Sequence, residues 1–309
     1  MNENYWFLWI LLASTLIAQA QQRSKGIYVI DAETQKPIPF VAVKNSRSNE
    51  GSYTNRSGRF ELLEFRQSDT LCIKHLGYEA KKIRIDQLKD TVVGLYQLPV
   101  ELDEVVINTK RLHPKTTVLG YANKSKILTW YMQPQMEFAV LLKYHKALTK
   151  ATIKEIQIPI NTKQLGAKRE KKRKFRTAFR VQVYENNDGI PGKSLLQQPP
   201  MVICNEKSAN LLKIQLQQPF PQFGAEGVFI GVEMLGAIDD AGTVRYQDRG
   251  RQILPGLRFT RKNKRRLSTK SYVKYPFLEN TWKSIASLTH FEDKGYKLAA
   301  SIVVVYDRK

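Results

Sequence analysis

The chain of 309 residues is long enough for two domains of about 150 residues, each able to bury its own core. Its 50 basic and 28 acidic residues leave a net charge of +22, which bears on partners and solubility rather than on fold. The only two cysteines, Cys72 and Cys204, exclude a disulfide framework and are spaced too widely for a zinc motif. We expect both to be buried, unpaired thiols.

The N-terminus carries an apolar run, WFLWILLASTLIA (residues 6–18), that contains no charge. This run suits a signal peptide and is shorter than the roughly 20 residues of a spanning helix, and Ala18-Gln19-Ala20 has the small-x-small pattern of a cleavage site. The preceding MNENY has no Lys or Arg, so an uncleaved anchor is the alternative. We expect a signal peptide at residues 1–20 and export to the periplasm or outer membrane, with the cell surface as a further location.

From Lys25 onward the chain consists of short β-rich runs bounded by Gly, Pro, Asn and Asp, a pattern typical of sandwiches. The main runs are GIYVID (26–31), PFVAVKN (39–45), RFELLEF (59–65), LCIKHL (71–76), KKIRI (81–85) and VVGLYQL (92–98). So many strands in about eighty residues leave no room for a helical layer. We therefore expect a small antiparallel β-sandwich.

The spacing of turn residues in this region resembles a known family, the carboxypeptidase regulatory-like domain. The resemblance rests on Gly26-x4-Asp31, Pro37-Ile38-Pro39, Thr54 to Gly58 with Phe60, Gly77-Tyr78, and the closing LDEVVI at residues 102–107. It covers residues 25–109 and implies a transthyretin-like β-sandwich, often found at the N-terminus of TonB-dependent receptors and other exported envelope proteins. It implies no peptidase activity, because the domain is the non-catalytic companion of the enzyme.

In such receptors a string like LDEVVI precedes a plug and a membrane-spanning barrel. Only about two hundred residues follow it here, without the many alternating strands and the outward apolar band that a barrel needs. We expect no transmembrane barrel, and we interpret the string as the terminal segment of the first domain.

Residues 110–131 are predicted to be a linker, since they contain Pro114 and few periodic apolar positions. Residues 132–309 then form a second β series, in which KEIQI (154–158) and RVQVY (180–184) alternate so that one face meets a core. We expect an all-β protein, with the transthyretin-like sandwich followed by a second β-sandwich of jelly-roll type.

The positive charge belongs to the second domain, because residues 111–309 hold 36 basic and 15 acidic residues, a net charge of +21. Two basic runs, KREKKRKFR and RKNKRR, lie between strand-like segments. We hypothesise that they bind a polyanion such as an acidic glycan or lipopolysaccharide, or contact an envelope protein; nucleic acid is not expected after export. The alternative is that they are solvated loops that keep the domain soluble. The candidate residues are Lys168, Arg169, Lys171, Lys172, Arg173, Lys174, Arg176, Arg261, Lys262, Lys264, Arg265 and Arg266.

Motifs for a nucleotide, a metal or a nucleophile are weak. GIPGKS (189–194) lacks the first glycine of a phosphate loop, because Asn187 stands in its place. The four histidines form no HExxH, the pattern GxSxG is missing, and Asp239 to Gly242 has too few acids to favour calcium over a β-turn. We therefore predict no nucleotide, no metal, no cofactor and no catalytic residue.

The alternative function is a glycan-active hydrolase. Its acids would be Glu155, Glu185 and Glu233. Two of these carboxylates about 5 to 9.5 Å apart in a cleft lined by aromatic residues would support the hydrolase hypothesis. Aromatic residues could pack in the core or form a platform for sugars; they are Trp130, Tyr131, Tyr272, Tyr275, Phe277 and Trp282. The leading interpretation is a non-catalytic, exported binding or interaction module of the cell envelope.

Overall fold

The computed structural model describes residues 26–48, 51–62, 65–88, 91–98, 114–122, 128–146, 148–163, 174–240, 242–245, 253–261, 266–275, 279–288 and 295–307. The predicted signal segment, LDEVVI and the greater part of both basic runs lie outside these ranges. Within them, no helix has both the length and the apolar character needed to cross a membrane.

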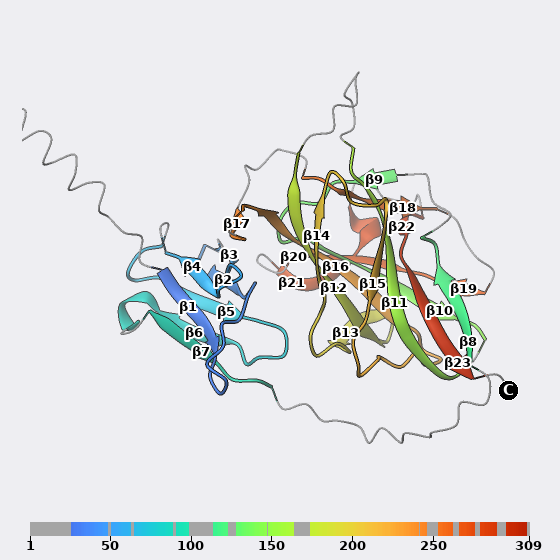
Figure 1. Ribbon diagram of the computed structural model, residues 1–309, viewed down its shortest axis with the longest axis horizontal. Coiled ribbons are helices and arrows are strands. Elements are labelled where there is room, and N and C mark those ends of the chain that lie inside the picture. The colour runs from blue at the N-terminus through green and yellow to red at the C-terminus, as the bar shows by residue number, and fades with distance from the viewer. Residues whose placement is uncertain are drawn as a thin grey trace, which may run out of the picture.

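The described residues form 23 strands and two short 3₁₀ helices, η1 (Ile85–Gln87) and η2 (Ile285–Ser287). The predicted all-β fold is therefore confirmed. Figure 1 shows two β-rich bodies, a smaller one formed by β1 to β7 and a larger one formed by β8 to β23.

The smaller body is a sandwich of two sheets around one apolar core, which includes Ile27, Val43 and Leu71. One sheet has the order β4 (Arg59–Glu61), β1 (Gly26–Asp31), β7 (Val92–Leu95). The other has the order β3 (Gly51–Tyr53), β2 (Ala42–Asn45), β5 (Thr70–Lys74), β6 (Lys81–Arg84). The sequence predicts a wholly antiparallel sandwich. This prediction is wrong for one pair of strands, because β1 pairs with β7 in parallel. These are the first and last strands of the domain, so no hairpin constrains their direction.

Thr54 and Gly58, two residues of the motif that resembles the family, stabilise turns of this domain. The hydroxyl of Thr54 donates to Ile38 O (3.0 Å) and accepts from Val41 N (2.9 Å), which ties the entry of β2 to the next turn. Gly58 has φ +72°, and a Cβ there would lie 2.5 Å from Val29 O, so only glycine fits. The family resemblance therefore rests on residues with a physical role.

The second domain is also a two-sheet sandwich. A nine-stranded sheet has the order β13 (Ile190–Ser194), β12 (Arg176–Asn187), β16 (Val228–Ile238), β10 (Glu137–Tyr144), β20 (Ser271–Tyr275), β21 (Glu279–Ser284), with β14 (Met201–Asn205), β17 (Val244–Arg245) and β19 (Leu267–Ser268) beside it. A seven-stranded sheet has the order β22 (Lys297–Leu298), β18 (Gly256–Thr260), β11 (Thr149–Asn161), β23 (Ser301–Asp307), β8 (Pro114–Gly120), with β15 (Leu211–Gln215) and β9 (Leu128–Trp130) beside it. Strands β8, β10, β11 and β12 alternate between the two sheets, as in the predicted jelly-roll type, whereas β12 and β16 are neighbours in the nine-stranded sheet.

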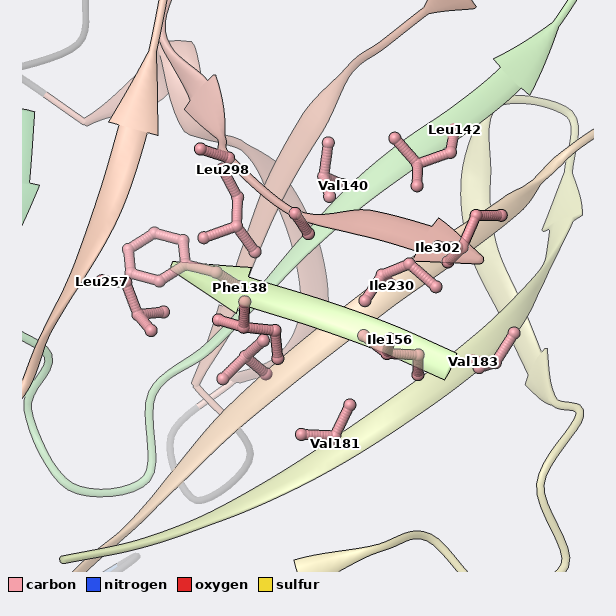
Figure 2. Close-up of a cluster of buried hydrophobic side chains, with 14 of the residues drawn as sticks. Phe138, Val140, Leu142, Ile156, Val181, Val183, Ile230, Leu257, Leu298 and Ile302 are labelled. Carbon is pink, nitrogen blue, oxygen red and sulfur yellow. The ribbon is translucent and has the colours of Figure 1, made fainter. Parts of the chain in front are cut away.

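The core of the second domain lies between these sheets. Figure 2 shows Phe138, Val140 and Leu142 of β10 and Val181 and Val183 of β12 among its members. From the opposite sheet come Ile156, Leu257, Leu298 and Ile302. Each strand contributes every second residue, which is the alternation that the sequence shows.

Part of the predicted linker is ordered structure of the second domain. Residues 114–120 form β8, which pairs along its whole length with β23, and residues 128–130 form β9, which pairs with β18. The run Thr116-Thr117-Val118-Leu119 favours a strand, and Pro114 is tolerated because it begins an edge strand. The expectation of a connection over 110–131 therefore needs correction at these two places.

Candidate functional site

The outer face of the nine-stranded sheet carries polar and aromatic side chains that are buried. On β12, Phe179, Val181 and Val183 belong to the main core, so Arg180 and Tyr184 project from the opposite face. A second, smaller apolar cluster lies on that outer face; it consists of Ala139, Leu141, Tyr184 and Phe229, with Tyr272 and Trp282 packed against it. All these side chains come from strands of this sheet and pack against one another on its outer face.

Four charged residues form a single row across this outer face, which we call the charge row. In the register of the strands, Arg180 pairs with Glu233, Glu233 with Glu137, and Glu137 with Lys274. Arg180 Nη1 lies 3.2 Å from Glu233 Oε2, and Lys274 Nζ lies 2.9 Å from Glu137 Oε2. The glutamate side chains are only 8% and 2% exposed, so each buried carboxylate is matched by a neighbouring cation.

Tyrosine hydroxyls donate to the remaining oxygen of each carboxylate. The hydroxyl of Tyr184 donates to Glu137 Oε1 (2.6 Å), and that of Tyr53 donates to Glu233 Oε1 (2.5 Å). Burial, together with the adjacent carboxylates, raises the pKa of both tyrosines well above the usual value, so the hydroxyls stay protonated donors. Burial also raises the pKa of Glu137; Lys274 opposes that shift and Glu233 adds to it.

Lys274 also lies against aromatic rings. Its Nζ is 4.2 Å from the centroid of the Trp282 ring and 5.6 Å from that of Tyr184, and the two rings meet edge to face at 5.7 Å. Such cation–π contacts are worth about 2 kcal/mol when desolvated, so Lys274 is held by aromatic faces as well as by Glu137. Gly231 makes room for this arrangement, because a Cβ there would lie 2.7 Å from Tyr184 Cε2.

The other end of the charge row joins the two domains. Arg180 Nη2 donates to Phe40 O (2.5 Å), and Gln135 Nε2 donates to Gly51 O (2.9 Å). These bonds surround an apolar cluster in which Phe40 and Tyr53 of the first domain pack against residues of the second; the latter are Ala178, Leu235, Ile238 and Val244. The first sandwich is therefore docked on the outer face of the nine-stranded sheet, where β3 and β17 lie side by side in Figure 1.

His75 of the first domain lies at this junction. Burial is the main reason why its pKa falls to about 3, and the positive charge of Arg180 adds to the effect. Its Nδ1 is 2.8 Å from Leu76 O, and its ring meets Tyr78 edge to face. His75 is therefore neutral at physiological pH.

The three acids proposed for a hydrolase do not come together. Glu155 lies on β11, in the seven-stranded sheet, and is bonded to the side chains of Gln157 and Gln215. Glu185 lies five positions from Arg180 along β12 and accepts from Lys193 N (3.0 Å) in the β12–β13 hairpin. Only Glu233 has an acidic neighbour, and that neighbour is Glu137. The sequence analysis missed Glu137, because this residue begins the apolar run EFAVLLKY and its partners come from other strands.

Four of the twelve predicted polyanion contacts lie in the described part of the chain. Arg176 Nη1 donates to Asp239 O (3.4 Å), and the guanidinium of Arg261 lies 5.7 Å from the centroid of the Tyr296 ring, while Lys174 and Arg266 are exposed. The others lie outside the described residues; they are Lys168, Arg169, Lys171, Lys172, Arg173, Lys262, Lys264 and Arg265.

Arg176 of the first basic run and Arg266 of the second are far apart. Arg176 lies four residues before Arg180 on β12. Arg266 precedes Leu267, which pairs with Tyr144, and Tyr144 lies seven residues after Glu137 on β10, a strand that runs in the same direction as β12. Since Arg180 and Glu137 share the charge row, these residues of the two runs are separated by about 35 Å along the sheet. Arg176 and Arg266 therefore lie at opposite ends of the sandwich.

The aromatic residues singled out in the sequence have different environments. Trp130 and Tyr275 pack against the main core, and Tyr131 donates to Lys163 O (2.8 Å). Tyr272 and Trp282 belong to the outer-face cluster, while Phe277 lies outside the described residues. Core packing therefore accounts for two of them, and two stand beside the charge row.

The remaining polar motifs are structural. Within the described ranges no group of three His, Cys, Asp or Glu residues could hold a metal ion. Asp239 and Gly242 form a turn, in which Gly242 N donates to Asp239 O (3.0 Å). Cys72 and Cys204 are buried and free, as predicted.

Comparisons with known proteins identify the first domain. Residues 27–107 match the family model of the CarboxypepD_reg-like domain, which confirms the predicted family for the N-terminal sandwich. No curated protein matches the chain.

One solved structure to which the chain is similar contains the cysteine protease and lectin-like domains of Cwp84, a surface layer associated protein of Clostridium difficile. The sequence identity is 8% and the TM-score 0.33, and the match covers 55% of this chain and 32% of that one. The chain thus spans about a third of that structure, and a likeness at this score carries no argument about function.

Proposed function

We propose that the protein is a non-catalytic, exported protein of the cell envelope, whose second sandwich binds an anionic glycan or lipopolysaccharide. The N-terminal domain supports the envelope setting through its family, which is common in exported proteins. Residues 1–20 would serve as the signal peptide.

One observation carries the proposal: two buried acids of the second domain are neutralised internally, whereas many of its described cations are at exposed positions. Glu137 and Glu233 are matched by Lys274 and Arg180 inside the protein. Residues 111–309 carry a net charge of +21, and a charge of this size attracts polyanions with a strong dependence on salt.

The proposal is tested with an array of acidic glycans and lipopolysaccharides at two salt concentrations. The native protein is expected to bind at low salt and to lose affinity steeply as salt rises. A variant with both basic runs changed to Gln loses twelve positive charges, Arg266 among them, and is expected to bind more weakly than the native protein. Binding that is insensitive to salt, or no binding by the native protein, would refute the proposal.

Export has its own test. N-terminal sequencing of the protein purified from the cell envelope is expected to begin near Gln21, after the small-x-small site. A chain that begins upstream of that residue would indicate an uncleaved anchor.

The second candidate function is a glycan-active hydrolase, which one observation favours. Glu137 and Glu233 are directly opposite on neighbouring strands. Opposed residues on one face have Cβ atoms about 4.5–5.5 Å apart, so the two carboxylates are neighbours, as a pair of glycosidase acids must be. Against it, both carboxylates are almost inaccessible and already bonded to a cation and a tyrosine.

Release of reducing ends from envelope glycans decides between the two functions. Activity that is lost in Glu137→Gln and Glu233→Gln but kept in Glu226→Gln, an exposed acid of the same domain, would establish the hydrolase. We expect no such activity in any of the three.

A further inference from the structure

The end of the second sandwich where β10 finishes and β11 begins brings together strand ends from both sheets. Residues 145–148 join Tyr144 of β10 to Thr149 of β11, so the two sheets meet within a few residues. Arg266 is adjacent, because His145 N donates to its carbonyl (3.0 Å). On the seven-stranded sheet, Thr149 and Pro114 flank Asp307 in the strand register. We call this region the β10–β11 end.

Exposed cations gather at the β10–β11 end. Within the described part of the chain none of them forms an ion pair; they are Lys115, Lys146, Lys150, Lys270 and Arg266. Lys115 pairs with Tyr306 at the start of β8, and Lys270 O accepts from Leu141 N (2.8 Å), three residues before the end of β10. Only Arg266 belongs to the basic runs recognised in the sequence, so the other four are contributed by the fold.

The acids of this end are fewer and partly engaged. Glu226 Oε2 lies 2.7 Å from Lys143 Nζ, so the two residues form an ion pair and add no net charge to this end. Asp188 is exposed in the β12–β13 turn, and Asp307 is half-buried at the end of β23. Glu185 of β12 is level with Leu142 and accepts from Lys193 N. Among the described residues, five cations without an ion pair thus face three further acids, so this end carries a net positive charge.

The opposite end of the sandwich also carries exposed cations, Lys174 and Lys207 among them, but it lies next to an acidic turn and to the first domain. There Arg176 donates to Asp239 O and lies 3.8 Å from Asp240 Oδ1, so acidic groups partly neutralise it. The first domain also occupies this end, where Arg56 lies against Gly242. In Figure 1, β8, β19 and β23 lie on the side of the second sandwich that faces away from the first domain.

We infer that the β10–β11 end is the surface on which the second domain binds the sulfate or phosphate groups of an anionic glycan. This inference rests on the proposed function and assigns it a place. The two sheets of a sandwich are about 10 Å apart, close to the Debye length at physiological salt, so the fields of cations on both sheets reinforce one another. Lysines act as point charges toward such groups, and Arg266 offers a bidentate contact.

The test compares two variants of the full chain that lose four positive charges each. The first changes the β10–β11 end: Lys146→Gln, Lys150→Gln, Arg266→Gln and Lys270→Gln. The matched control changes the first basic run: Lys171→Gln, Lys172→Gln, Arg173→Gln and Lys174→Gln. The probes are a heparin-like sulfated polysaccharide, which has no lipid, and lipopolysaccharide, each titrated at 50 and 200 mM salt.

We expect the first variant to bind both probes at least about tenfold more weakly than the native protein and to show a shallower dependence on salt. The control is expected to stay within about threefold of the native protein. Circular dichroism shows whether the variants are folded, and all four changes at the β10–β11 end are at exposed positions.

Each other outcome is decisive. If the control loses affinity and the β10–β11 variant does not, or if both lose it equally, the inference is overturned while polyanion binding stands. If the native protein binds neither probe, the proposed function fails as well. Binding of lipopolysaccharide alone would place the recognised phosphates on the lipid rather than on a polysaccharide and would overturn the assignment to a glycan.

Discussion

Replacing Glu233 by Ala removes the carboxylate that joins the two domains. In the native protein this group accepts from Arg180 at 3.2 Å and from the hydroxyl of Tyr53 at 2.5 Å. The side chain of Arg180 is only 11% exposed, so Glu233→Ala leaves a buried cation without its anion. Removing one partner of a buried ion pair costs about 3–5 kcal/mol, which we expect as the loss in free energy of unfolding.

Urea denaturation measures this loss, and thermal unfolding gives an independent value. At about 2–4 °C per kcal/mol for a chain of this size, the midpoint should fall by about 6–20 °C. The matched control is Glu226→Ala, which breaks an exposed pair with Lys143 and should cost less than about 1 kcal/mol. If Glu233→Ala were no more destabilising than this control, the domains would not be docked in solution through a buried pair.

Three further predictions concern the same junction and the thiols. Tyr53→Phe deletes one hydrogen bond to a carboxylate and should lower the free energy of unfolding by about 1.5–3 kcal/mol in urea titrations; no measurable loss would contradict the bond. The pKa of His75 is about 3 in the folded protein against an ordinary 6.5, so the unfolded state takes up a proton that the folded state refuses as pH falls between these values. The native protein should therefore lose stability relative to His75→Gln from pH 6.5 toward pH 3, and parallel pH profiles would argue against this. Cys72 and Cys204 are buried, and burial raises the pKa of Cys204 to about 12, so a thiol reagent should label neither in the native protein and both after denaturation.

Local patterns account for the parts of the fold that could be predicted. The alternation in RVQVY places Val181 and Val183 in the core, because successive residues of a strand face opposite sides whatever the strand pairs with. Gly58 could be recognised for the same reason, since a turn with positive φ is a local requirement. The predicted linker was wrong at residues 114–120, because whether a short run forms a strand depends on a partner, and β23 comes almost two hundred residues later.

The amino-acid sequence alone determined the β class, the family of the first domain, the free thiols and the excess charge of the second domain. Each depends on residue type or on short spacing. The tertiary structure alone decided that Glu137 and Glu233 stand side by side and that Tyr53 reaches Glu233 from the other domain. It also decided that Arg176 and Arg266 lie at opposite ends of the sandwich and that His145, next to Lys146, is bonded to the carbonyl of Arg266. These arrangements depend on strand register and sheet order, which link residues far apart in the chain and leave no local signal in the sequence.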